Sequence, residues 1–181
     1  MAIVLDGSNG ITTNSGTVIS ASTIGVGGAT PSTSGAGITF PATQSASSDA
    51  NTLDDYEEGT FTPIVYGLSS AGTTTYSDQV GFYTKVGNVV TAFYQVTVSA
   101  MTGTGAVALG GLPFTTNSSG ASAAPVMIEG LNWGGGSYVQ LYIGSSRTYA
   151  IPYYMTDDSN WASQQCVNET QAYIATITYR V

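Results

Sequence analysis

Hydrophobic and polar residues alternate with a period of two over most of the chain beyond residue 60. In the run NVVTAFYQVTVSA, one set of alternate positions holds Val90, Ala92, Tyr94, Val96 and Val98. The intervening positions hold Val89, Thr91, Phe93, Gln95 and Thr97. Successive side chains of a strand point to opposite faces of a sheet, so this run predicts one long strand with two different faces.

The same kind of pattern predicts about eight strands in all. Their predicted ranges are 61–67, 73–87, 88–100, 106–114, 124–133, 137–145, 148–155 and 170–181. Turn signals rich in glycine and asparagine separate several of them. No segment carries the hydrophobic stripe of an amphipathic helix of any length. This spacing of short strands predicts an all-β fold, an antiparallel β-sandwich of the jelly-roll type or a barrel.

The first 55 residues differ from the rest in composition. Residues 29–50 are mostly Ser, Thr, Ala, Gly and Pro, and a segment of this kind buries too little apolar surface to offset its ordering entropy. We therefore expect residues 1–55 to form an extended docking and trimerisation arm, and residues 56–181 to form a displayed β-domain. The apolar residues expected to dock the arm are Ile3, Val4, Leu5, Ile11, Val18, Ile19 and Ile24.

Charge and composition exclude several classes of function. Only 8% of the 181 residues are charged, the net charge is −8, and the three basic residues are Lys85, Arg147 and Arg180. Nucleic acids and anionic membrane surfaces are bound by clusters of cations, so we expect neither partner. The chain has no histidine, which excludes catalytic triads built on histidine and histidine-ligated zinc. We also expect no signal peptide and no membrane-spanning segment.

Four carboxylates lie together in NTLDDYEEGTFTP: Asp54, Asp55, Glu57 and Glu58. A glycosidase pair needs two carboxylates held across a cleft, which neighbours on a linker do not provide. Oxygen ligands suit calcium, but the spacing is not that of an EF-hand loop. The favoured interpretation is a solvated boundary between the arm and the domain, with a metal site as the alternative. We expect no cofactor and no enzymatic activity.

Tyrosine and tryptophan are the candidate recognition residues. The chain has twelve tyrosines and two tryptophans, and in loops these side chains form rigid platforms for sugars or protein partners. Packing in the core or in a subunit interface is the alternative role. Trp161 lies among polar residues, so we expect it to be exposed. The residues expected to contact a receptor or partner are Trp133, Tyr138, Trp161, Asp157 and Asp158.

Three motifs carry a resemblance to a known family. They are LDDYEEGTFTP at residues 53–63, GFYTKVGN at 81–88 and GLPF at 111–114. Together they resemble a domain that recurs in the tail fibres and tail spikes of tailed bacteriophages. The resemblance covers roughly residues 50–181.

The resemblance implies a non-enzymatic, β-rich domain in a homotrimeric virion appendage that is displayed for contact with the host surface. Expected partners are other virion proteins of the tail, baseplate or capsid, and a host glycan or protein. The expected location is the virion, after synthesis in the host cytoplasm. A long fibre would need a shaft, so a short fibre or spike is favoured. A capsid decoration or head-fibre protein of the same fold is the alternative, and a polysaccharide depolymerase is disfavoured.

Overall fold

The computed structural model describes residues 22–130, 138–155 and 160–181 and divides the chain into two compact units, Met1–Ser45 and Ala46–Val181. The boundary predicted from the sequence, after residue 55, falls inside the second unit. Of the residues expected to dock the arm, Ile24 is described. The other six, Ile3, Val4, Leu5, Ile11, Val18 and Ile19, lie outside the described residues.

In the first unit, the described part contains a small parallel pair of strands, β1 (Thr23–Gly25) and β2 (Gly37–Thr39). Ile24 and Ile38 are partners in this pair, and both remain exposed. Strands of three residues bury little surface, so the pair supplies few of the contacts that a stable core needs.

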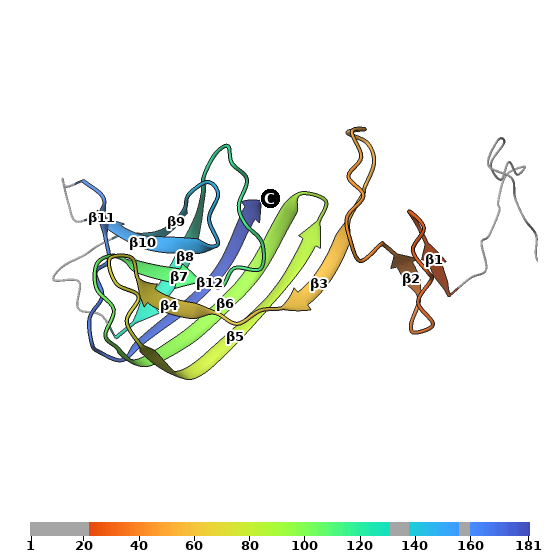
Figure 1. Cartoon of the computed structure of the whole chain (residues 1–181). Coiled ribbons are helices and arrows are strands. Elements are labelled where there is room, and N and C mark those ends of the chain that lie inside the picture. The colour runs from red at the N-terminus through yellow and green to blue at the C-terminus, as the bar shows by residue number, and fades with distance from the viewer. Residues whose placement is uncertain (1–21, 131–137, 156–159) are drawn as a thin grey trace, which may run out of the picture. The chain divides into compact units, whose positions relative to one another are not determined.

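The second unit is an all-β domain built from one curled antiparallel sheet (Figure 1), as the alternating pattern predicts. Its strands lie in the order β3-β5-β6-β12-β8-β9-β10-β7-β4, and β11 pairs with β10. The strands are β3 (Tyr56–Thr60), β4 (Ile64–Gly67), β5 (Thr74–Val86), β6 (Val89–Met101), β7 (Val107–Gly110), β8 (Ser122–Glu129), β9 (Tyr138–Ile143), β10 (Tyr149–Met155), β11 (Ala162–Ser163) and β12 (Gln171–Arg180).

Strand β8 joins the two layers of the curled sheet. Its residues 126–129 pair with β12, and its residues 122–125 pair with β9. The first layer is therefore β3, β5, β6 and β12, and the second is β9, β10, β7 and β4. At the open side, side chains of the first layer bond to the backbone of β4: the Tyr94 hydroxyl donates to the Ile64 carbonyl at 2.7 Å, and the Thr74 hydroxyl to the Val65 carbonyl at 2.7 Å.

The core lies between the two layers and is made from one face of each long strand. From β6 it takes Val90, Ala92, Tyr94, Val96 and Val98, and from β12 it takes Tyr173, Ala175, Ile177 and Tyr179. The second layer contributes Val65, Leu109, Leu141 and Ile143. The predicted alternation along residues 88–100 is confirmed, and the structure identifies which of the two sets is buried.

One segment departs from the predicted pattern. Residues 56–60 form the edge strand β3, whereas the sequence predicts a linker there. Their composition, YEEGT, does not suggest a strand because Glu and Gly are depleted in strands. Pairing with the longer β5, from Tyr56↔Val86 to Thr60↔Phe82, outweighs this weak preference.

Candidate functional site

The described residues contain an open groove of about 490 Å³ on the outer surface of the second layer. It is lined by Ala123 of β8, by Gln140, Leu141 and Tyr142 of β9, by Tyr153 of β10, and by Trp161. A volume of this size is within the usual range for small-molecule sites, about 300–1,000 Å³. The groove is therefore the leading candidate for a recognition site.

Two tyrosine rings line the groove. Tyr142 and Tyr153 come from adjacent antiparallel strands, and their ring centroids are 5.9 Å apart with an interplanar angle of 87°. Edge-to-face pairs of this kind are attractive, so each ring helps to hold the other in place. Gln140 is the cross-strand partner of Tyr153, which brings an amide group beside the rings.

Trp161 is positioned by the short strand that follows it. In β11, Ala162 and Ser163 pair with Tyr154 and Tyr153 of β10. The next residue is anchored on both sides: the Gln164 N–H donates to the Pro152 carbonyl, and the Gln164 carbonyl accepts from the Val107 N–H, each at 2.8 Å.

The side chain of Gln164 adds a further anchor in the interior. It is buried, and its amide donates to the Gln171 side-chain oxygen at 2.9 Å and to the Tyr173 hydroxyl at 2.6 Å. Leaving a buried amide without its hydrogen bonds would destabilise the folded protein. These contacts therefore fix the register of the segment. Trp161, which is 48% exposed, is therefore held at the rim of the groove rather than on a free loop.

The groove can bind a ligand through aromatic surfaces and neutral hydrogen bonds. Among the lining residues that the structure describes, no side chain is charged, and Tyr142, Tyr153 and Trp161 combine an apolar ring with a polar group. Such a surface suits a flat, neutral, hydroxyl-rich ligand.

The structure places the predicted contact residues as follows. Trp161 lines the groove and is exposed, as its polar neighbours predict. Tyr138 begins β9 and is 74% exposed, but it is not among the lining residues. Trp133, Asp157 and Asp158 lie outside the described residues.

Sequence reasoning missed Tyr142 and Tyr153. The run YVQLYI, residues 138–143, places Tyr138, Gln140 and Tyr142 on one face, and this face is the outer one because Leu141 and Ile143 are buried. The alternation could therefore have placed these three residues on one face. Only the pairing of β9 with β10 brings Tyr153 to the same face.

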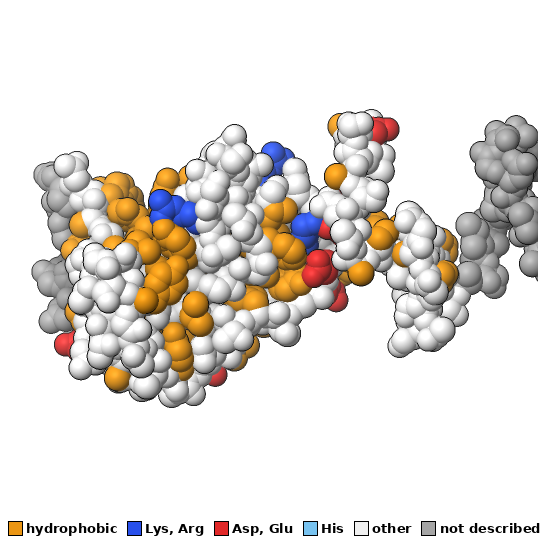
Figure 2. Space-filling model, viewed as in Figure 1, with side chains coloured by type: hydrophobic (Ala, Val, Ile, Leu, Met, Phe, Trp, Pro, Cys, Tyr) orange, Lys and Arg blue, Asp and Glu red, His pale blue; other side chains and the backbone are white. Residues whose placement is uncertain are grey.

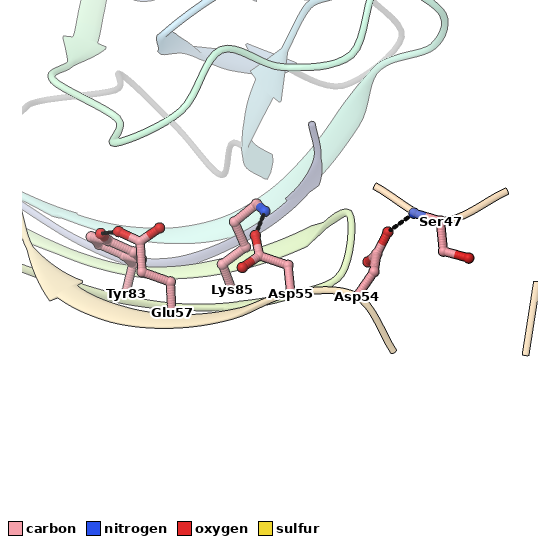
Figure 3. Close-up of polar contacts among 6 residues, drawn as sticks. All are labelled: Ser47, Asp54, Asp55, Glu57, Tyr83 and Lys85. Atoms are coloured by element: carbon pink, nitrogen blue, oxygen red, sulfur yellow. Dashed lines mark hydrogen bonds and ion pairs between the residues drawn. The ribbon is translucent and has the colours of Figure 1, made fainter. Parts of the chain in front are cut away.

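The acidic segment forms a structural site rather than a solvated boundary. Asp55 is buried and makes an ion pair with Lys85, which is also buried. Figure 3 shows that neighbouring carboxylates turn to other partners: Asp54 accepts a hydrogen bond from the Ser47 N–H at 2.8 Å, and Glu57 accepts one from the Tyr83 hydroxyl. The predicted solvation is therefore wrong for Asp55, because a cation that lies far away in sequence stabilises its charge in the interior.

The four carboxylates do not converge on a common point. Glu58, on the exposed face of β3, accepts a hydrogen bond from the Tyr56 hydroxyl. In the described parts of the chain, no three acidic, cysteine or histidine side chains lie close enough to share a metal ion. Figure 2 shows few charged side chains on the visible surface, with acidic and basic atoms close together beside β3. Each of the four carboxylates thus has its own hydrogen-bond or ion-pair partner.

The three motifs at residues 53–63, 81–88 and 111–114 pack against one another. A β-carbon at Gly59 would lie 2.6 Å from the Tyr83 hydroxyl oxygen, so only glycine leaves room for this cross-strand ring. The Phe114 ring packs edge-on against Tyr83, at 5.2 Å between centroids, and lies 5.7 Å from the Lys85 ammonium. These contacts bring the three motifs together in one corner of the domain, where their residues stabilise the packing.

Because of the tyrosines in this corner, the stability of the domain is expected to change with pH in the alkaline range. The hydrogen bond to Glu57 raises the pKa of Tyr83 to about 12, and burial raises the pKa of Tyr179 to about 12. An unfolded tyrosine has a pKa of about 10, so the folded state holds these protons more tightly. Their contribution to stability is complete below pH 10 and is lost as the pH rises toward 12.

We expect the free energy of unfolding to fall between about pH 10 and pH 12. Urea unfolding at a series of pH values would measure this fall, and Tyr83→Phe should make it shallower because one of the shifted phenols is gone. An equally steep fall in the Tyr83→Phe variant would show that the Tyr83 phenol does not contribute.

Two lone side chains have ordinary structural roles. The Arg147 guanidinium lies 5.0 Å from the centroid of the Tyr149 ring and donates to the Tyr149 hydroxyl. Cys166 is half-buried against the core, and burial raises the pKa of its thiol, which disfavours the reactive thiolate.

Among the described residues no helix is long and apolar enough to span a membrane.

In comparisons with known proteins, no family model, no curated protein and no solved structure matches this chain.

Proposed function

We propose that the protein is a structural subunit of a tailed-phage virion, a short tail fibre or spike whose β-domain is displayed for contact with the host surface. The resemblance of residues 53–63, 81–88 and 111–114 to phage fibre and spike domains supports the class. An all-β domain, together with a separate unit whose described part contains one short pair of strands, is consistent with a displayed domain and a docking arm.

The single observation that carries the contact function is the aromatic groove at Tyr142, Tyr153 and Trp161. Sugar rings present flat faces of C–H groups that pack on aromatic rings, while their hydroxyls bond to neutral polar groups such as the Gln140 amide. Because no described lining side chain is charged and the chain has a net charge of −8, a neutral saccharide fits better than an acidic one.

Replacing Trp161 with alanine is expected to reduce binding to the host surface about tenfold or more, because exposed aromatic anchors carry a large share of contact energy. Retention of the purified chain on host cells, and competition by neutral cell-wall saccharides, would measure the effect. The thermal unfolding midpoint should change little because Trp161 is half exposed.

The matched control is Leu68→Ala, another exposed apolar side chain that does not line the groove. It should leave host binding unchanged. Full retention of binding by Trp161→Ala, in a chain that stays folded, would remove the groove as the contact site. Release of reducing ends from host polysaccharide by the wild-type chain would contradict a purely structural function.

A further inference from the structure

The face of β9 that lines the groove continues beyond it to Tyr138. Gln140 and Tyr142 line the groove, and Tyr138 lies two residues before Gln140 on the same strand. Side chains two residues apart in a strand point to the same side of a sheet. Strands β9 and β10 remain paired over this length (Figure 1), because Tyr138 is the cross-strand partner of Met155. The surface that carries the groove therefore extends at least to Tyr138.

Three tyrosines lie along this surface in a zigzag over two strands. Tyr142 and Tyr153 are diagonal neighbours, because Tyr142 pairs with Ile151 and Tyr153 lies two residues further on. Tyr138 pairs with Met155, so Tyr153 is its diagonal neighbour as well. Diagonal neighbours in a sheet are about 7–8 Å apart, within reach of aromatic side chains. Tyr153 thus lies between the other two tyrosines.

Tyr138 and Tyr142 are far enough apart to contact different units of a ligand. Tyr142 is four residues beyond Tyr138 on β9, which corresponds to about 13 Å along the strand. The Tyr142 and Tyr153 rings, by contrast, are in direct contact at 5.9 Å between centroids and act as one platform. A single sugar ring cannot span the distance from that platform to Tyr138, whereas consecutive rings of a saccharide chain can.

The Tyr138 ring is available to a ligand. It is 74% exposed, the largest value for a large apolar side chain among the described residues. A single exposed tyrosine is common on protein surfaces, but this one continues an aromatic groove. On the neighbouring strands, the exposed Pro125 of β8 pairs with Gln140, and the half-buried Met155 of β10 pairs with Tyr138. Tyr138 therefore lies on an apolar surface that a second flat ring can cover.

The described part of this surface is uncharged between its two ends. Strands β8 to β11 carry one charged residue, Glu129, at the end of β8. At the opposite end, a β-carbon at Gly144 would lie 3.1 Å from the Arg147 Nε and 3.4 Å from the Tyr142 ring, which places Arg147 just beyond the groove. The two aspartates that follow β10 lie outside the described residues. The surface from Tyr138 to Tyr142 thus suits a neutral chain, as the groove does.

We propose that Tyr138 forms a second subsite of the groove, so that the protein binds a neutral saccharide chain lying along β9 rather than a single sugar. The groove holds one unit of the chain, and Tyr138 stacks on a unit further along it. The Gln140 amide lies between the two positions and can bond to hydroxyls of either unit. The inference rests on the proposed function, because it assumes that the groove binds saccharides, and it adds the length and orientation of the ligand.

The test measures the affinity of the full chain, by titration calorimetry, for neutral fragments of host cell-wall polysaccharide separated by length. For the wild type, affinity should rise about tenfold from the single sugar to longer fragments and then level off, because exposed aromatic anchors carry a large share of contact energy. Tyr138→Ala should abolish this rise and leave the affinity for the single sugar unchanged. Tyr138→Phe, which keeps the ring, should retain most of the rise.

Tyr56→Ala is the matched control, because Tyr56 is also an exposed tyrosine at the first position of a strand but lies on β3 in the other layer. It should leave the rise with length unchanged, and far-ultraviolet circular dichroism should show that every variant remains folded. A Tyr138→Ala chain that keeps the full rise would overturn the inference. An equal loss for the single sugar and for long fragments would also overturn it, because Tyr138 would then only support the groove.

The outcomes separate this inference from the proposed function. Binding of the single sugar that Trp161→Ala weakens, with no gain for longer fragments, would support the groove and overturn the second subsite. Absence of binding at every fragment length would overturn the saccharide-binding groove and the second subsite together. Host binding that saccharides do not compete for, but that Tyr138→Ala weakens, would indicate a protein partner on this surface and would likewise overturn the inference.

Discussion

Replacing Lys85 with methionine is expected to lower the free energy of unfolding by about 3–5 kcal/mol. Methionine keeps most of the apolar stem but removes the ammonium group, which leaves the Asp55 carboxylate buried without its cation. The contact with the Phe114 ring is also lost. Urea unfolding monitored by circular dichroism would give the change directly.

The double variant Lys85→Met, Asp55→Leu tests whether the unpaired charge causes the loss. Replacing both members of a buried ion pair by apolar groups is often neutral, so most of the stability should return. Arg147→Met is the matched control for removing a cation. Arg147 is exposed, and its loss should cost less than about 1 kcal/mol. A loss for Lys85→Met as small as that for Arg147→Met would contradict the importance of the buried pair.

Replacing Gly111 with alanine is expected to cost about 2–5 kcal/mol. Two effects contribute to this cost: the backbone conformation of Gly111 and a steric clash. Gly111 has a φ of +82°, a region that costs other residues about 1–2 kcal/mol, and a β-carbon there would lie 2.3 Å from the Thr62 carbonyl oxygen. The clash is with backbone, so it cannot be relieved by turning a side chain.

Gly120→Ala separates these two terms. Gly120 also has a positive φ, +100°, but a β-carbon there would meet nothing within 4 Å. This variant should therefore lose only the backbone term, about 1–2 kcal/mol. Equal losses in the two variants would show that the approach of residues 111 and 62 does not constrain the fold.

The acidic segment illustrates why its chemistry could not be assigned from local sequence. Asp54, Asp55, Glu57 and Glu58 are neighbours in the chain, and local reasoning groups them as one solvated cluster or one metal site. Because of strand alternation and the preceding turn, their side chains point to different partners. Asp55 makes an ion pair with Lys85, which lies 30 residues further along the chain. The sequence offers no signal for that pairing beyond the scarcity of cations.

The aromatic groove was predicted only in part. Exposure of Trp161 followed from its polar neighbours, because a large ring among Asp, Ser and Asn has no local apolar surface to cover it. Its association with Tyr142 and Tyr153 depends on pairing between β9, β10 and β11, which lies beyond any local pattern.

By itself the sequence determined the fold class and the division of each long strand into two faces. Side-chain direction in a strand has a period of two whatever the surroundings, so the alternation along β6 and β12 is a local property. The absence of histidine and the scarcity of cations were equally independent of the fold, and they excluded several kinds of chemistry.

Only the tertiary structure decided which face is buried and what the exposed face carries. Both faces of β6 hold apolar residues, and the choice between Tyr94 and Phe93 depends on where the second layer lies once β8 has turned the sheet. Burial is a property of the whole assembly of strands, because water is excluded only where two layers meet. For the same reason Phe82 and Phe93 are left facing outward.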